Sequence, residues 1–210
     1  MAELPTKALE QYAVYMREVK QRTHVVSNVV ARYNAGSSLT GYRESDVELA
    51  FLQLRKCLEL VMFASLVAHY HSGVSLQKRL AEKEWNATKV MAFLARVNPK
   101  FFPKPLRRVL EPDGKMSQVH PVEGAMTKAE FSKLYDQLCG HYLHASRTPA
   151  FAGKHETLFN EISIYLGKLV TLLNHHWVTV TEDWEFAVVM QSDTDGDVHV
   201  ALLEAVSDRK

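Results

Sequence analysis

Two histidines, His141 and His144, lie three residues apart within a helical pattern. On a helix this spacing puts both imidazoles on one face, where such a pair can ligate a metal ion. No third ligand follows at a useful spacing, so the sequence predicts neither a metal site nor a cofactor. His144 is still a candidate general acid or base, because an imidazole exchanges protons near neutral pH.

A proline-rich strap, residues 98–105, is the second candidate for chemistry. Five basic residues lie in or next to the strap, with no acidic residue among them, and we call them the strap cations: Arg96, Lys100, Lys104, Arg107 and Arg108. They could neutralise phosphates while the rings of Phe101 and Phe102 stack on bases, which together would form a docking patch for RNA. Alternatively the rings fill the core and the cations keep a loop solvated. The sequence leaves both interpretations open.

The remaining polar motifs have simpler explanations. Three aspartates between 193 and 197 lack the frame and closing Glu of a calcium loop, which favours a polar hairpin turn. Cys57 and Cys139 lie far apart in helical patterns without a CxxC motif, which favours burial over a disulfide or zinc site. Arg55 and Glu59 have the spacing of an intrahelical ion pair.

Composition limits the classes of function. The 210 residues are 47% hydrophobic and 23% charged, with a formal net charge of +1, so no overall field recruits nucleic acid or a membrane. The N-terminus lacks an apolar signal core. The longest apolar run, residues 60–68, is too short to cross a bilayer, so we expect a cytoplasmic protein without membrane contact.

Apolar residues that recur every three or four positions predict five helices, at about 6–34, 45–72, 75–97, 127–145 and 155–178. The first two carry matching stripes and should pack antiparallel. Capping boxes at 45–48 and 127–130 mark two helix starts. His69 and His176 lie on apolar stripes. His176 should be buried, whereas His69 could be either a buried or a helix-capping group. Close helix packing would explain Gly167 in the last helix.

Two segments favour β-hairpins, one at 107–119 around a Pro-Asp-Gly turn and one formed by 184–191 and 198–206. A lone hairpin is marginal in water, so the second must lie on the bundle, pair with the first, or pair with another chain. We therefore predict a mainly α protein: an antiparallel bundle of about five helices over 1–180, a small inserted hairpin, and a C-terminal β-hairpin over 181–210.

Two helical segments resemble the HEPN (higher eukaryotes and prokaryotes nucleotide-binding) superfamily. They are Leu134-Tyr135-Asp136-Gln137-Leu138-Cys139-Gly140-His141-Tyr142-Leu143-His144-Ala145 and Leu54-Arg55-Lys56-Cys57-Leu58-Glu59-Leu60. The resemblance spans about 44–176 and implies a bacterial helical bundle of a defence or toxin–antitoxin system. Many such proteins are metal-independent ribonucleases whose site is assembled across a dimer. The resemblance thus implies action on RNA and a homodimer formed through the 127–145 helix.

The family's site is an Arg followed, after four to six residues, by a His, and this His corresponds to His144. The matching Arg positions instead hold Gln137, Leu138 and Cys139. In-line RNA cleavage needs an acid or base near the 2′-OH and a cation near phosphorus. The cation would then come from Arg147, Arg55 or a partner chain. A formal Arg-x6-His match at Arg17 and His24 lies on the first helix, outside the family's usual location.

The missing Arg also supports a second hypothesis, a catalytically inactive interaction subunit of a multi-protein defence complex. The free edge of the C-terminal hairpin could extend a partner's sheet. A weaker third hypothesis is a sensor that holds a small molecule in the bundle.

Overall fold

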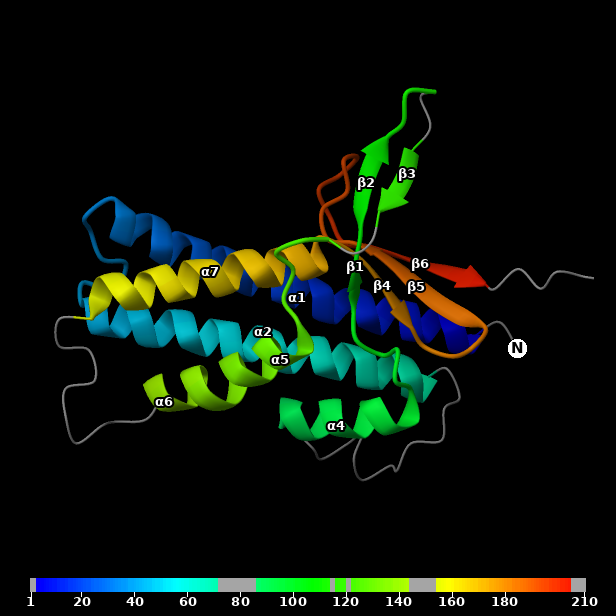
Figure 1. Ribbon diagram of the computed structural model, residues 1–210, viewed down its shortest axis with the longest axis horizontal. Helices are drawn as coiled ribbons and strands as arrows, with labels where there is room; N and C mark the ends of the chain where they lie inside the picture. Colours follow the sequence, from blue (N-terminus) through cyan, green and yellow to red (C-terminus); the bar gives the residue numbers. More distant parts are fainter. Residues whose placement is uncertain (1–2, 72–85, 114–115, 120–121, 144–153, 205–210) are drawn as a thin grey trace, which may run out of the picture.

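The apolar stripes of the N-terminal half form two long helices, α1 (Glu3–Asn34) and α2 (Arg43–His71). In the computed structural model they lie side by side and antiparallel, as predicted (Figure 1). Their facing side chains are fully buried, among them Tyr12 and Met16 of α1 and Phe51 of α2. The structure describes residues 3–71, 86–113, 116–119, 122–143 and 154–204.

The start of α2 differs from the predicted capping box. The helix begins at Arg43, so Ser45 lies inside its first turn. Asp46 holds the preceding loop instead: its carboxylate accepts a 2.6 Å hydrogen bond from Ser38 and bonds of 3.0 and 2.9 Å from the next two backbone N–H groups. A buried carboxylate with three loop donors fixes the loop on the helix, and the chain therefore enters the helix earlier.

Shorter helices pack around this pair (Figure 1). They are α4 (Ala87–Val97), α5 (Lys128–Ser132), a π-helical turn (Lys133–Cys139), α6 (Gly140–Tyr142) and α7 (His155–Leu173). The predicted capping box of Thr127 and Glu130 is confirmed at the start of α5. Asn86 caps α4, and the predicted part of this helix over 75–85 lies outside the described residues.

The last predicted helix is too long, because it ends at Leu173 and not at residue 178. Strand β4 (His175–Thr179) follows and pairs along its whole length with β5 (Trp184–Val189). Aromatic and β-branched residues such as Trp177 and Val178 suit a strand. Pairing with a later segment therefore overrides the helical period. A Cβ placed on Gly167 meets no atom within 4 Å, so close packing does not explain this glycine.

The predicted C-terminal hairpin is confirmed as β5 and β6 (His199–Glu204), and it joins a larger antiparallel sheet of order β1-β4-β5-β6. β1 (Lys104–Pro105) comes from the strap, so the sheet takes strands from both sides of residue 180. The inserted hairpin, β2 (Arg107–Leu110) and β3 (Met116–Val119), is a separate ladder that projects from the molecule (Figure 1).

One hydrophobic core joins the bundle and the sheet, since Val178 and Phe186 belong to the same buried cluster as the helix residues. Cys57 and Cys139 are buried and free, as predicted. The predicted burial of His176 is confirmed, and of the two alternatives for His69 the structure shows burial.

Candidate functional site

The two residues predicted to be catalytic, His144 and Arg147, lie outside the described residues. The described part of this segment stops at Leu143, so their placement stays a prediction. The neighbouring His141 is exposed, and its ring contacts that of Tyr142 edge-on at 4.9 Å.

The structure brings together the two segments that carry the HEPN resemblance. Arg55 and Glu59 lie one turn apart on α2, and Tyr135 meets them from the π-helical turn. We call these three residues the Arg55 cluster. Arg55 donates hydrogen bonds to Glu59 (3.2 Å) and to the Tyr135 hydroxyl (3.0 Å), and that hydroxyl donates to the same Glu59 oxygen (2.9 Å). The predicted ion pair of Arg55 with Glu59 is thereby confirmed.

The Arg55 cluster holds a cation at the surface of the bundle. The guanidinium carbon of Arg55 lies 4.2 Å from the Tyr135 ring centroid, and the Arg55 side chain is 22% exposed. Burial, together with the bond to Glu59, raises the pKa of Tyr135 to about 12, so the hydroxyl stays protonated and keeps donating. These contacts leave N–H groups of Arg55 that can donate to an anion, although the Glu59 carboxylate offsets part of the Arg55 charge.

The π-helical turn explains how Tyr135 reaches α2. Leu134 and Cys139, five residues apart, are both buried beside Tyr135, which fits the wider period of a π-helix. Asp136 anchors the turn on its other side, since both of its carboxylate oxygens accept from Thr88 of α4 at 3.0 Å. Such turns often occur at functional sites.

The rings of the strap are core residues. Phe101 is fully buried and Phe102 is 8% exposed. The Phe102 ring also meets Phe131 edge-on, with 5.9 Å between centroids. The expectation that these rings stack on bases is therefore wrong, and the alternative that they fill the core is confirmed.

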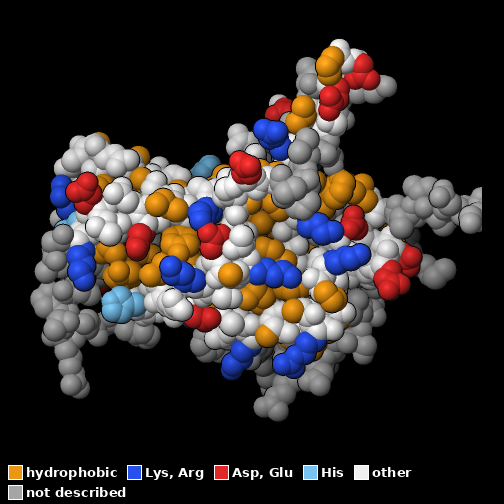
Figure 2. Space-filling model, in the orientation of Figure 1, with side chains coloured by type: hydrophobic (Ala, Val, Ile, Leu, Met, Phe, Trp, Pro, Cys, Tyr) orange, Lys and Arg blue, Asp and Glu red, His pale blue; other side chains and the backbone are white. Residues whose placement is uncertain are grey.

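The strap cations remain near the surface, with acidic neighbours. Lys100 and Arg107 are exposed, whereas Lys104 is half-buried with Nζ 4.0 Å from Glu185; the side chain of Arg108 is not described. Figure 2 shows Lys and Arg side chains over β1 and α5 with acidic side chains among them.

One cation of this surface was missed. Lys128 of α5 donates to the Pro99 carbonyl (3.2 Å) and lies 4.9 Å from the Phe101 ring centroid. No local signal could have placed it there, because it comes from nearly thirty residues further along the chain.

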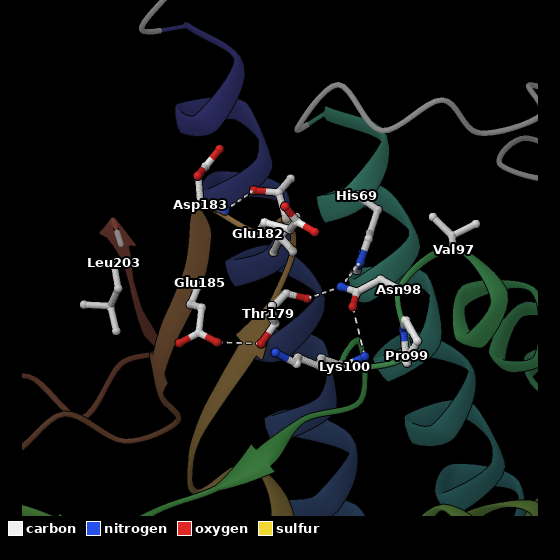
Figure 3. A pocket seen from close by; sticks show the side chains of 12 residues that line it. His69, Val97, Asn98, Pro99, Lys100, Thr179, Glu182, Asp183, Glu185 and Leu203 are labelled. Atoms are coloured by element: carbon white, nitrogen blue, oxygen red, sulfur yellow. Dashed lines mark hydrogen bonds between the residues drawn. The ribbon is translucent and has the colours of Figure 1, made fainter. Parts of the chain in front are cut away.

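A hollow of about 610 Å³ opens beside the strap, between the ends of α2 and α4 and the β4–β5 turn (Figure 3). Asn98 lines this hollow, and its side-chain amide donates a 2.7 Å hydrogen bond to the Thr179 carbonyl. Lys100 and three carboxylates, those of Glu182, Asp183 and Glu185, line the hollow. These carboxylates repel phosphate, so an RNA backbone is disfavoured on this side of the strap.

His69, at the back of this hollow, is a structural residue. Its Nδ1 donates to the Ser65 carbonyl (2.6 Å), so Nε2 is the acceptor of the Asn98 amide (3.0 Å). Burial lowers the pKa of His69, which keeps the ring neutral. With both nitrogens engaged, the ring is not available as a general base.

The two residues of the formal Arg-x6-His match lie on α1 and not beside the strap. Arg17 pairs with Asp197 of the β5–β6 turn at 3.0 Å, and His24 is exposed two turns further along α1.

Within the described parts of the chain, no three His, Cys, Asp or Glu side chains are grouped so that they could hold a metal ion. No described helix has an apolar stretch that could cross a membrane. Comparison with family models, with curated proteins and with solved structures finds no match for this chain.

Proposed function

We propose that the protein acts on RNA as a HEPN-like protein of a bacterial defence or toxin–antitoxin system. The observation that carries the proposal is the contact between the two segments on which the HEPN resemblance rests. Through this contact Arg55 is held against the helix that leads to His144. The family's own Arg is missing, and Arg55 can replace its charge.

The chemistry would be metal-independent transphosphorylation. His144 takes the proton of the 2′-OH, and the 2′-oxygen attacks the adjacent phosphorus. The bond from phosphorus to the 5′-oxygen breaks, that oxygen takes a proton from water, and the His144 imidazolium returns its own proton to the solvent. The products are a 2′,3′-cyclic phosphate and a 5′-hydroxyl. Arg55, with Arg147 as a further phosphate contact, stabilises the charge that develops on the phosphoryl oxygens.

Docking would use the exposed cations of the strap and of α5. Lys100, Arg107 and Lys128 are exposed and can neutralise phosphates. Lys104 and Arg108 belong to the proposed patch by their place in the sequence. A homodimer through the 127–145 helix would bring two copies of His144 together. The exposed side chains of this helix, such as Lys133, Gln137 and His141, are polar, which suits a small and wet interface.

The test is cleavage of end-labelled single-stranded RNA by the full chain in the presence of EDTA. We expect cleavage that leaves a 2′,3′-cyclic phosphate, its loss in His144→Ala, and a loss of about a hundredfold or more in Arg55→Gln. His141→Ala, an exposed histidine of the same helix, is the matched control and should cleave normally. Circular dichroism checks that each variant is folded. Absence of cleavage, or full activity of His144→Ala, contradicts the catalytic assignment.

A specific observation favours the second candidate, an inactive subunit of a defence complex. β6 is the last strand of the four-stranded sheet, and its outer edge pairs with no described strand. An extended segment of another protein could add to this edge. Recovery of one stoichiometric partner from the native host, by a chain that does not cleave RNA, would favour this function over the first.

A further inference from the structure

Three basic side chains on one face of α1 border a groove that the proposed function does not use. Arg17, Lys20 and His24 follow one another at three- and four-residue spacings, which places them on the same side of the helix. Together with Gln21 and Asp197 they line a hollow of about 220 Å³. Sequence reasoning noted two of these residues only as a formal motif.

A second hollow, of about 230 Å³, lies next to the first, because Lys20 and His24 line both. Its apolar wall is formed by Leu169 and Leu173 of α7 and by Met190, all buried. Polar side chains at its rim are Ser27, Asn174 and Gln191. An apolar cavity of about 150 Å³ is known to hold benzene, so this hollow has room for one aromatic ring.

Two of the basic side chains already donate hydrogen bonds to oxygen atoms of the β5–β6 turn. Arg17 Nε donates to both carboxylate oxygens of Asp197, at 3.2 and 3.0 Å, and Lys20 donates to the Gly196 carbonyl. The pair of Arg17 with Asp197 is about half exposed, at 46% and 49%, and such pairs contribute little to stability. An incoming anion can therefore replace Asp197 on Arg17 at small cost.

Holding the turn does not account for the rest of the groove. Within the described residues, His24 has no hydrogen bond or ion pair, and its exposed ring lies between the basic hollow and the apolar one. If the basic side chains only held the β5–β6 turn in place, a role that we call a turn clamp, neither this ring nor the hollow beside Met190 would be needed. The two hollows together have a basic end and an apolar end, which is the pattern of a site for an amphipathic anion.

We propose that this groove binds a small organic anion with a compact apolar body. Its phosphate or carboxylate group lies on the three basic side chains of α1, where the guanidinium of Arg17 offers paired N–H donors. Its body lies in the hollow beside α7, whose lining includes Met190, a residue type that packs well against aromatic rings. The site is independent of RNA cleavage, since it shares no residue with the proposed catalytic groups.

The test is a calorimetric titration of the full chain with phenyl phosphate, in which the His24 ring signals are followed in parallel by NMR. Phenyl phosphate should bind about tenfold or more tightly than inorganic phosphate or phenol, because each of these fills one end only. Benzoate, compared with phenyl phosphate, shows whether the preferred head group is a carboxylate or a phosphate. The His24 signals should shift with the bound probe.

Variants separate a binding site from a turn clamp. Arg17→Gln, and independently Lys20→Gln, should weaken phenyl phosphate about tenfold. Asp197→Asn should strengthen it about threefold, because the competing carboxylate is gone. Asp193→Asn makes the same charge change in the same turn, but Asp193 lines neither hollow, so affinity should stay unchanged.

Three results overturn the proposal. The first is that the His24 signals shift with none of the probes. The second is that neither Arg17→Gln nor Lys20→Gln lowers the affinity for phenyl phosphate in folded protein. The third is that inorganic phosphate binds as tightly as phenyl phosphate.

Discussion

At the scale of single residues, His176 shows how burial turns a titratable group into a structural one. Its Nδ1 donates to the Leu173 carbonyl (2.7 Å), and its Nε2 therefore accepts from the Tyr12 hydroxyl (2.9 Å). The ring ties the first helix to the sheet across 164 positions of sequence. Burial lowers the pKa of His176 to about 4, since a charged ring would lose its hydration there.

This shift predicts a loss of stability in mild acid. Below about pH 6.5 the unfolded chain binds a proton that the folded chain refuses until about pH 4, so the stability present at neutral pH is lost as pH falls through that window. His176 alone contributes up to about 3 kcal/mol to this loss. The check is the free energy of unfolding in urea at pH 7.5, 6 and 5.

The control for this prediction is a pair of variants. His176→Gln should be less stable than the parent at pH 7.5 but should lose less stability between pH 7.5 and pH 5. His141→Gln, at an exposed position, should follow the parent at every pH. Parallel curves for the parent and His176→Gln would show that this ring does not control the acid response.

At the scale of elements, the hydroxyl of Tyr135 joins α2 to the π-helical turn. The Tyr135 oxygen accepts from Arg55 and donates to Glu59, so it connects two elements that are eighty residues apart. The ion pair of Arg55 with Glu59 follows from sequence spacing, whereas its position against Tyr135 depends on how the elements pack.

Tyr135→Phe removes both hydrogen bonds and keeps the ring. We expect a loss of about 1–2 kcal/mol in the free energy of unfolding, because two partly buried polar groups each lose a partner. Urea denaturation measures it. Tyr42→Phe, at a tyrosine that is 60% exposed, is the control and should be neutral. Equal stability of Tyr135→Phe and the parent would mean that the hydroxyl contributes nothing to this contact.

At the scale of the whole molecule, the charges nearly cancel, with a formal net charge of +1. Any RNA binding must therefore depend on the few exposed cations near the strap rather than on a general field. The carboxylates beside the strap limit this surface further.

We expect Lys100→Gln and Lys128→Gln each to weaken the binding of single-stranded RNA to a similar degree for different sequences. Each contact removed should lower the salt dependence, the slope of log K against log salt, by about 0.7. Lys154→Gln, an exposed lysine at the N-terminus of α7, is the control and should change neither quantity. Fluorescence anisotropy at several salt concentrations measures both, and unchanged slopes in the two strap variants would exclude this surface.

Features with a local cause could be predicted from the order of the amino acids. The long helices, the capping box of Thr127 and the hairpin formed by β5 and β6 follow from side-chain periods and turn residues within a few positions. The tertiary structure decided where α7 ends, that Phe101 fills the core, and that Arg55 meets Tyr135. Each of these depends on a partner far away in the sequence, because strand pairing and burial are set by what packs against a segment and not by its own period.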